Sequence, residues 1–282
     1  MKFIQFSALV ILCCIFSCGD HKTSQKDSED NPDSAVPKGY NLVWSDEFDD
    51  TPNGLPGNEW RFETGNNGWG NNELQNYVNR VLGTDTVAKI QNGKLIIVAH
   101  KLEVPYQGSD IISARMNTVQ SWKYGYFEMR ARLPGGRGTW PAFWMLPQKD
   151  SKDWILAGEI DIMEYVGCYP GMAHATVHTK AYHQTKGTAK TASYKVPDAE
   201  QEFYTYSLLW TENEIKAYIN GDGFFSFKND KTGNRETWPF DEPFYLKLNL
   251  AIGGDWGGLK GIDPDIFPAR YEIDYVRVYQ PK

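Results

Sequence analysis

The chain has 282 residues and a net charge of -7, with a pI near 5.3, so it lacks the basic surface that a nucleic-acid-binding protein needs. Aromatic residues make up 14% of the chain and 26 glycines are available for turns. This composition suits a strand-rich fold, and the length fits one large domain.

The first eighteen residues have the features of an export signal. Lys2 precedes an apolar run from Phe3 to Phe16, which is too short for a mature membrane-spanning helix but typical of a secretory signal peptide. The run ends in residues 15–19, Ile-Phe-Ser-Cys-Gly, which resemble a bacterial lipobox and imply lipidation of Cys18. We therefore expect an exported lipoprotein at the bacterial cell envelope, with the outer-membrane surface as one location. Ordinary cleavage that releases a soluble product is the alternative.

Residues 19–38 are polar and charged and have almost nothing to bury, which predicts a flexible tether. The folded domain is then expected over residues 39–282. Cys168 would be its only cysteine, because the other three lie within residues 1–18. An internal disulfide is excluded in that case.

Short strand-like runs recur along the folded domain, with turn residues between them. They are residues 41–44, 87–91, 94–100, 111–117, 125–132, 142–146, 159–165, 173–179, 203–211, 214–219, 244–252 and 271–279. Asn92-Gly93 and Asn220-Gly221 are typical of hairpin turns, because both residue types tolerate positive φ. This spacing predicts an all-β sandwich of two curved antiparallel sheets.

The predicted strand 159–165 carries three carboxylates among apolar residues. Side chains alternate along a strand, so Glu159 and Asp161 share one face while the isoleucines that follow them point into the core. Glu164 has the opposite parity. One extra residue, a β-bulge near Met163, would turn Glu164 onto the face of the other two acids, and such bulges occur beside active sites.

Three like charges on one strand face are unfavourable, because each carboxylate disfavours ionisation of the next. Glycoside hydrolysis requires two carboxyl groups in different environments, one ionised and one protonated. We interpret Glu159 as the nucleophile and Glu164 as the acid/base, with Asp161 holding a proton or hydrogen bond that separates their pKa values. The alternative is a solvated polar face or a row of metal ligands, although calcium sites usually come from loops.

Five segments follow the order of a known family: residues 138–147, 158–167, 175–182, 248–256 and 273–279. Together they resemble glycoside hydrolase family 16, and within it the laminarinase-type endo-β-1,3-glucanases. The resemblance covers almost the whole chain from Tyr40 onward. It implies a β-jelly-roll with a concave substrate cleft, retaining cleavage of internal bonds in laminarin-like β-glucans without a catalytic cofactor, and the three roles assigned above. We expect a monomer.

The extra residue Met163 resembles the laminarinase, agarase and carrageenase branches, whereas lichenases typically lack it. Residues 177–188 also resemble the laminarinase branch. The motif segments contain few of the basic residues that sulfated galactans would favour. Two alternatives remain: a hydrolase of red-algal galactans, and a surface lectin that binds glucan without cutting it.

Three tryptophans are candidates for sugar binding. Trp140 and Trp144 lie four residues apart on one predicted strand and share a face, where an indole ring can stack on a pyranose or pack into the core. Trp256 lies in a Gly-Gly-Asp-Trp-Gly-Gly loop, in which the glycines let the backbone approach a ligand. Each has a packing role as its alternative.

The resemblance places four polar residues near the substrate. Asn72, Arg115 and Asn249 match positions that bond to sugar hydroxyls, and His178 lies near the acids, where it would contact the middle acid or the sugar. Each of them has a scaffold hydrogen bond as its alternative. A zinc pair of His178 with His174 would require a helix, whereas the surroundings are predicted to be strand.

Many family members carry a calcium ion on the convex face, held by one carboxylate and several backbone carbonyls. Glu47, Gly93 and Asp274 match those positions. The resemblance therefore implies a structural calcium ion that holds the two chain ends together. Carboxylates that are simply exposed at the strand ends are the alternative.

Overall fold

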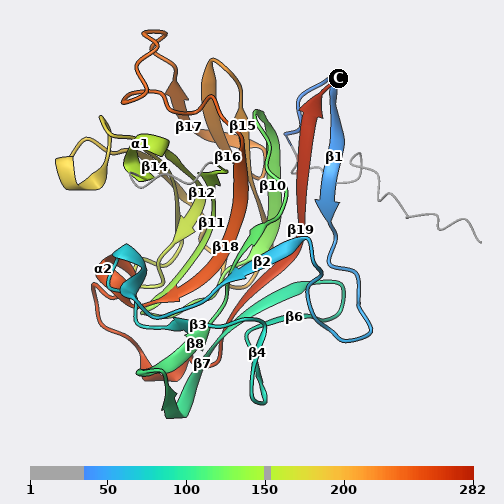
Figure 1. Cartoon of the computed structure of the whole chain (residues 1–282), viewed down its shortest axis with the longest axis vertical. Helices are drawn as coiled ribbons and strands as arrows, with labels where there is room; N and C mark the ends of the chain where they lie inside the picture. Colours follow the sequence, from blue (N-terminus) through green and yellow to red (C-terminus); the bar gives the residue numbers. More distant parts are fainter. Residues whose placement is uncertain (1–34, 149–153) are drawn as a thin grey trace, which may run out of the picture. The chain divides into compact units, whose positions relative to one another are not determined.

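Two curved β-sheets, packed face to face, form the part of the chain that the computed structural model describes, residues 35–148 and 154–282 (Figure 1). The larger sheet has the spatial order β17-β16-β15-β10-β19-β7-β8-β3, with β1 paired to β19 and β6 paired to β7. Its strands are β1 (Tyr40–Asp46), β3 (Asn76–Tyr77), β6 (Ala88–Ile90), β7 (Leu95–Tyr106), β8 (Ser109–Ser113), β10 (Gly125–Arg132), β15 (Tyr204–Trp210), β16 (Glu214–Ile219), β17 (Asp222–Lys228) and β19 (Ala269–Pro281).

The smaller sheet has the order β14-β13-β12-β11-β18-β9-β2 and is antiparallel throughout. Its strands are β2 (Trp60–Glu63), β9 (Arg115–Thr118), β11 (Thr139–Pro147), β12 (Glu159–Tyr165), β13 (Met172–His178), β14 (Lys190–Lys195) and β18 (Phe244–Ile252). Figure 1 shows its strands curving together, with α1 and α2 beside the concave side.

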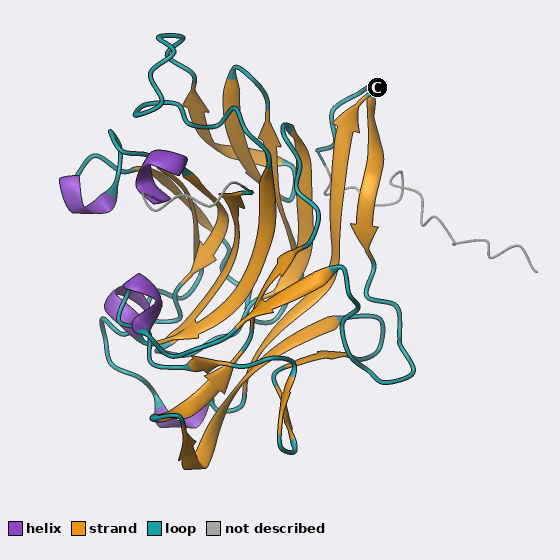
Figure 2. Cartoon of the chain, viewed as in Figure 1, coloured by secondary structure: helices purple, strands orange, loops and turns teal. Residues whose placement is uncertain are grey.

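Strand dominates the described residues, and the helices are single turns (Figure 2). A separate two-stranded ribbon is formed by β4 (Val81–Leu82) and β5 (Asp85–Thr86). The remaining elements are the short helices η2 (Gly68–Gly70), α1 (Trp154–Ala157), η3 (Gln184–Lys186), α2 (Gly254–Gly257) and η4 (Pro264–Ile266). None of the helices in this part of the chain has the length and apolar character needed to cross a membrane.

Alternation of side chains explains why the sheets pack on one another. In β18 the leucines 246, 248 and 250 are fully buried in the core between the sheets. Lys247 and Asn249 alternate with them and therefore lie on the opposite face of the smaller sheet. In β12 the isoleucines 160 and 162 and Met163 also lie in this core.

The predicted all-β sandwich is confirmed, and four predicted strands have the bounds of β10, β12, β16 and β18. The single strand predicted over residues 111–117 is wrong. Its two halves are β8 and β9, which lie in different sheets, because the chain crosses between the layers at the buried Ala114. β14 and β17 were not predicted. β14 is mostly polar and exposed, whereas β17 carries phenylalanines at 224, 225 and 227 that could have indicated a strand.

The export signal, the proposed lipidation site Cys18 and most of the tether lie outside the described residues. The first strand begins at Tyr40, next to the predicted start of the folded domain. Cys168 is buried and carries a free thiol.

Candidate active site

β12 contains the irregularity that the parity of its acids predicted. Asp161 and Glu164 lie opposite Thr176 and His174 of β13, so three residue steps on β12 match two on β13. The pairing with β11 shifts in the same stretch. The two residues between the acids are both buried, at 2% and 0% exposure. The predicted bulge is therefore confirmed, and it returns Glu164 to the face of the other two acids.

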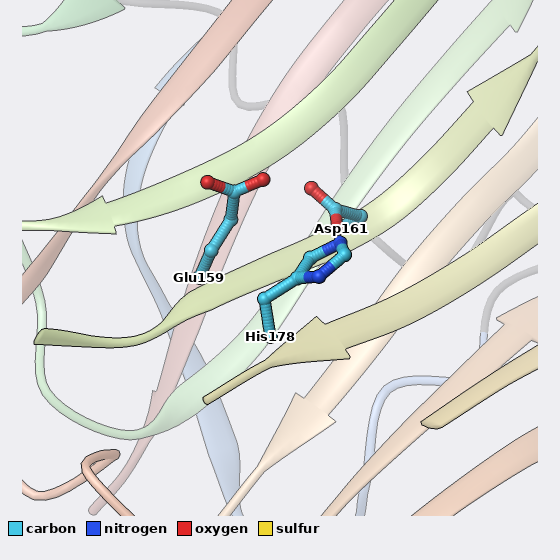
Figure 3. A group of neighbouring side chains, drawn as sticks. All are labelled: Glu159, Asp161 and His178. Carbon is cyan, nitrogen blue, oxygen red and sulfur yellow. Dashed lines mark ion pairs between the residues drawn. The ribbon is translucent and has the colours of Figure 1, made fainter. Parts of the chain in front are cut away.

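Asp161 lies at the centre of the site. It is 3% exposed, it hydrogen-bonds to the side chain of Glu159, and one of its carboxylate oxygens is 3.2 Å from Nε2 of His178 (Figure 3). The third acid has a different partner, because Nε1 of Trp140 donates to Oε1 of Glu164 over 3.1 Å. Each carboxyl group is thus oriented by a neighbour.

Burial is the main cause that raises the pKa of each acid. The pKa of Glu159 is raised further by Asp161 and lowered by His178 and Arg115. That of Glu164 is raised further by both other acids and lowered by His178 and the indole N–H. Three such carboxyls cannot all ionise at neutral pH. Of the two glutamates, Glu159 is the one whose ionised form the charge of Arg115 favours.

The raised pKa of Glu159 predicts a pH-dependent gain in stability for Glu159→Gln. Its pKa is 4.5 when exposed and rises to about 8 in the folded chain. The stability that protonation gives is complete below pH 4.5 and is lost as the pH rises toward 8, because the unfolded chain then binds fewer protons than the folded one. Glutamine does not titrate, so the variant does not lose this stability as the pH rises.

Urea unfolding at pH 5 and pH 8 measures this effect. We expect the free energy of unfolding of the variant, relative to the unmodified chain, to be higher at pH 8 than at pH 5 by on the order of 2 kcal/mol. Glu272→Gln on β19, in the other sheet, is the matched control and should show no such pH trend. An equal difference at both pH values would contradict a raised pKa.

The polar side-chain atoms of Trp144 and Asn249 hydrogen-bond to other side chains of the protein. Trp144 is 8% exposed and its Nε1 donates to Oδ1 of Asn249 over 2.8 Å. Nδ2 of Asn249 in turn donates to the hydroxyl of Tyr77 over 3.1 Å. These contacts favour the scaffold alternative for both residues, which fix the sheet beneath the acids.

Arg115 belongs to a charged cluster that the sequence reasoning missed. It forms an ion pair with Glu63, which also accepts from Nζ of Lys247 over 2.7 Å. The Arg115 guanidinium lies 4.5 Å from the ring centre of Trp69 and 4.8 Å from that of Trp144. Burial, and then the charge of Arg115, lower the pKa of the fully buried Lys247 to about 8.

Part of this cluster could have been found from the sequence. The alternation in β18 places Lys247 on the face of Asn249, which was already a candidate. Trp69 gave no such signal, since it lies in η2 with φ of 50°, a left-handed conformation unusual for a bulky residue. Backbone strain of this kind accumulates near functional sites.

The other two tryptophan candidates meet next to Glu164. The rings of Trp140 and Trp256 are 5.6 Å apart in an edge-to-face arrangement, and both are partly exposed. Asn72 approaches the same region, because its Nδ2 donates to Oδ1 of Asp255 over 2.8 Å in α2, next to Trp256. The structure therefore brings these three candidates together at the acid/base end of the site.

The residues predicted to hold calcium contact other groups. Both carboxylate oxygens of Glu47 accept from Arg277 at 2.9 Å, and Oδ2 of Asp274 accepts from Arg130 at 2.7 Å. The N–H of Gly93 donates to Asp50. Carboxylates neutralised by guanidinium groups do not fit a calcium site, which needs free oxygen ligands.

The zinc pair is not formed, because His178 contacts Asp161 while Nδ1 of His174 lies 2.9 Å from Oγ of Ser193. Within the described residues, one cluster has metal-ligand character, with atoms of Glu159, Asp161 and His178 all within 4.8 Å of one another. These carboxylate and imidazole atoms are also the groups that acid/base catalysis requires, so the cluster does not by itself indicate a metal site.

Comparison with known proteins gives a consistent result. The model of the family described as glycosyl hydrolases family 16 matches residues 74–277. A β-glucanase from Rhodothermus marinus is 47% identical over 254 residues, which cover 86% of this chain and 85% of that protein. The solved laminarinase from Rhodothermus marinus has a TM-score of 0.81 at 45% identity and covers 86% of this chain and 98% of that one.

A third relative was solved with a sugar bound. It is a variant of SCLam, a non-specific endo-β-1,3(4)-glucanase, co-crystallised with 1,3-β-D-cellotriosyl-glucose. Its TM-score is 0.81 at 44% identity, and the match covers 87% of this chain and 96% of that one.

Proposed function

Since the chain belongs to family 16 of the glycosyl hydrolases, we propose that it is an endo-β-1,3-glucanase of the laminarinase type, with β-glucan as its partner. It cuts internal bonds of laminarin-like glucans and retains the anomeric configuration. The observation that carries this function is the bulge in β12, which turns Glu159, Asp161 and Glu164 to one face.

The residues of this face divide the reaction into two steps. Glu159 attacks the anomeric carbon while Glu164 donates its proton to the glycosidic oxygen, so the leaving sugar departs as an alcohol and a glycosyl ester remains. Glu164 then takes a proton from water, which attacks the same carbon and releases Glu159. Asp161 holds Glu159 by a hydrogen bond and is itself held by His178. No step uses a metal or cofactor.

Parallel assays on laminarin, lichenan, agarose and carrageenan test the substrate class. We expect laminarin to be cut fastest into short oligosaccharides, detected by chromatography, with slower release from lichenan and none from the two galactans. Release from agarose without release from laminarin would contradict the proposal and favour a galactan hydrolase. Binding of laminarin with no turnover would favour the lectin.

The location of the enzyme is a separate proposal, supported by the apolar run and the lipobox-like residues 15–19. We infer that a lipid on Cys18 holds the chain at the cell envelope, with residues 19–38 as a tether. Cys18→Ser should move laminarinase activity from the membrane fraction to the soluble fraction. Retention in the membrane fraction would contradict the anchor. The resemblance implies a calcium ion, whereas the arginines paired with Glu47 and Asp274 argue against it, and melting temperatures measured in calcium and in EDTA decide between the two.

A further inference from the structure

One side chain beside the acid/base has no role in the two steps described above. His178 and His174 of β13 lie directly opposite Glu159 and Glu164 of β12. Cβ atoms of directly opposed residues are roughly 4.5 to 5.5 Å apart and point to the same face of the sheet. The mechanism uses His178, which holds Asp161, but leaves His174 unassigned although it flanks the group that donates the proton.

The contacts of His174 fix one ring nitrogen and leave the other without a partner in the described part of the chain. Nδ1 lies 2.9 Å from Oγ of Ser193 on β14, and the ring packs edge-to-face against Trp256 at 4.9 Å. Nε2 is buried and has no hydrogen-bond partner within the described part of the chain. Burial lowers the pKa of His174, which keeps the ring neutral at neutral pH.

A buried polar atom without a partner is costly, so the orphaned nitrogen needs an explanation. A neutral imidazole offers one donor and one acceptor, and sugar hydroxyls complement either. The ring is also held in place on one side by Ser193 and on another by Trp256. A side chain that is oriented in this way, with one free nitrogen, has the properties of a ligand-binding group rather than of core packing.

The position of His174 indicates which sugar it meets. Glu164 donates its proton to the glycosidic oxygen, so the unit that departs with this oxygen must lie against Glu164 and its neighbours. Trp140 donates to Glu164, His174 lies opposite it, and Trp256 packs against the rings of both. We propose that Nε2 of His174 hydrogen-bonds to a hydroxyl of the leaving glucosyl unit and so sets its orientation for cleavage. This inference rests on the proposed function and names a specificity-determining residue for it.

Two substrates separate this role from a structural one. With laminari-oligosaccharides, whose leaving group is a sugar, His174→Ala should lower kcat/KM about five- to tenfold, as expected for one lost hydrogen bond. With an aryl β-laminaribioside the leaving group has no hydroxyls to bind, and the loss should be about twofold or less. His174→Gln, whose amide reaches toward the place of Nε2, should recover part of the loss on the oligosaccharides.

The controls keep the test decisive. His100→Ala alters a histidine of β7 in the other sheet, where Nε2 contacts the carbonyl of Thr86, and should change neither substrate. Equal losses on both substrates, or no loss on the oligosaccharides, would overturn the role of His174. Absence of turnover of oligosaccharides by the unmodified chain would instead contradict the proposed function, and this inference with it.

Discussion

Glu159→Ala is expected to lower kcat on laminarin on the order of 10⁵-fold, since removal of a nucleophile eliminates the covalent path. The two other carboxyl groups cannot replace it, because Asp161 is bonded to His178 and Glu164 is needed as the proton donor. The truncated side chain also leaves space beneath the anomeric carbon, into which a small anion fits.

Rescue by azide distinguishes loss of the nucleophile from loss of the folded site. With an aryl β-laminaribioside, added azide should restore turnover of Glu159→Ala and give the α-glycosyl azide, because a single displacement inverts the configuration. Glu272→Ala in the other sheet is the carboxylate control and should retain activity on laminarin. Retained activity of Glu159→Ala on laminarin, or a β-glycosyl azide as product, would contradict the role of Glu159.

The second large effect concerns Glu164 and depends on the leaving group. Glu164→Ala should lower kcat/KM on laminarin by about 10²- to 10⁴-fold, the usual contribution of general acid catalysis. An aryl glycoside with a strongly acidic phenol needs little protonation, so its kcat/KM should fall by about tenfold or less. The ratio of the two losses therefore reports the role of the proton donor.

The pH profile gives an independent test of the same residue. Burial raises the pKa of Glu164 to about 8, so the group is protonated below that pH and loses its proton as the pH rises through it. The kcat/KM of the unmodified chain on laminarin should therefore fall above about pH 8, and this alkaline limb should be absent in Glu164→Ala. Equal losses on both substrates, with the limb preserved, would contradict the assignment.

The bulge shows how far sequence alone can predict such a site. Its presence follows from parity, because Glu164 falls on the wrong face of a regular strand that otherwise buries apolar residues. The partners of the acids follow only in part. The contact between His178 and Asp161 was expected from the resemblance, whereas the N–H donor of Trp140 to Glu164 depends on how β11 lies beside β12.

Other features could not be predicted because they join distant parts of the chain. The carboxylate of Glu47 meets Arg277, 230 residues away, and this contact changes the interpretation of a calcium ligand. Glu63 joins Arg115 and Lys247 on three different strands. The break at Ala114 was also hidden, since residues 111–117 contain no glycine or proline to show that the chain passes from one sheet to the other.

The central claim is that the bulge in β12 places a nucleophile and a proton donor on one face. Incubation with 2-deoxy-2-fluoro-β-laminaribiosyl fluoride tests it most directly, because the ring fluorine slows both steps while fluoride leaves readily and the glycosyl ester accumulates. Mass spectrometry of the digested protein should locate one fluoroglycosyl group on Glu159. A label on Glu164, or no label together with products of inverted configuration, would contradict the claim.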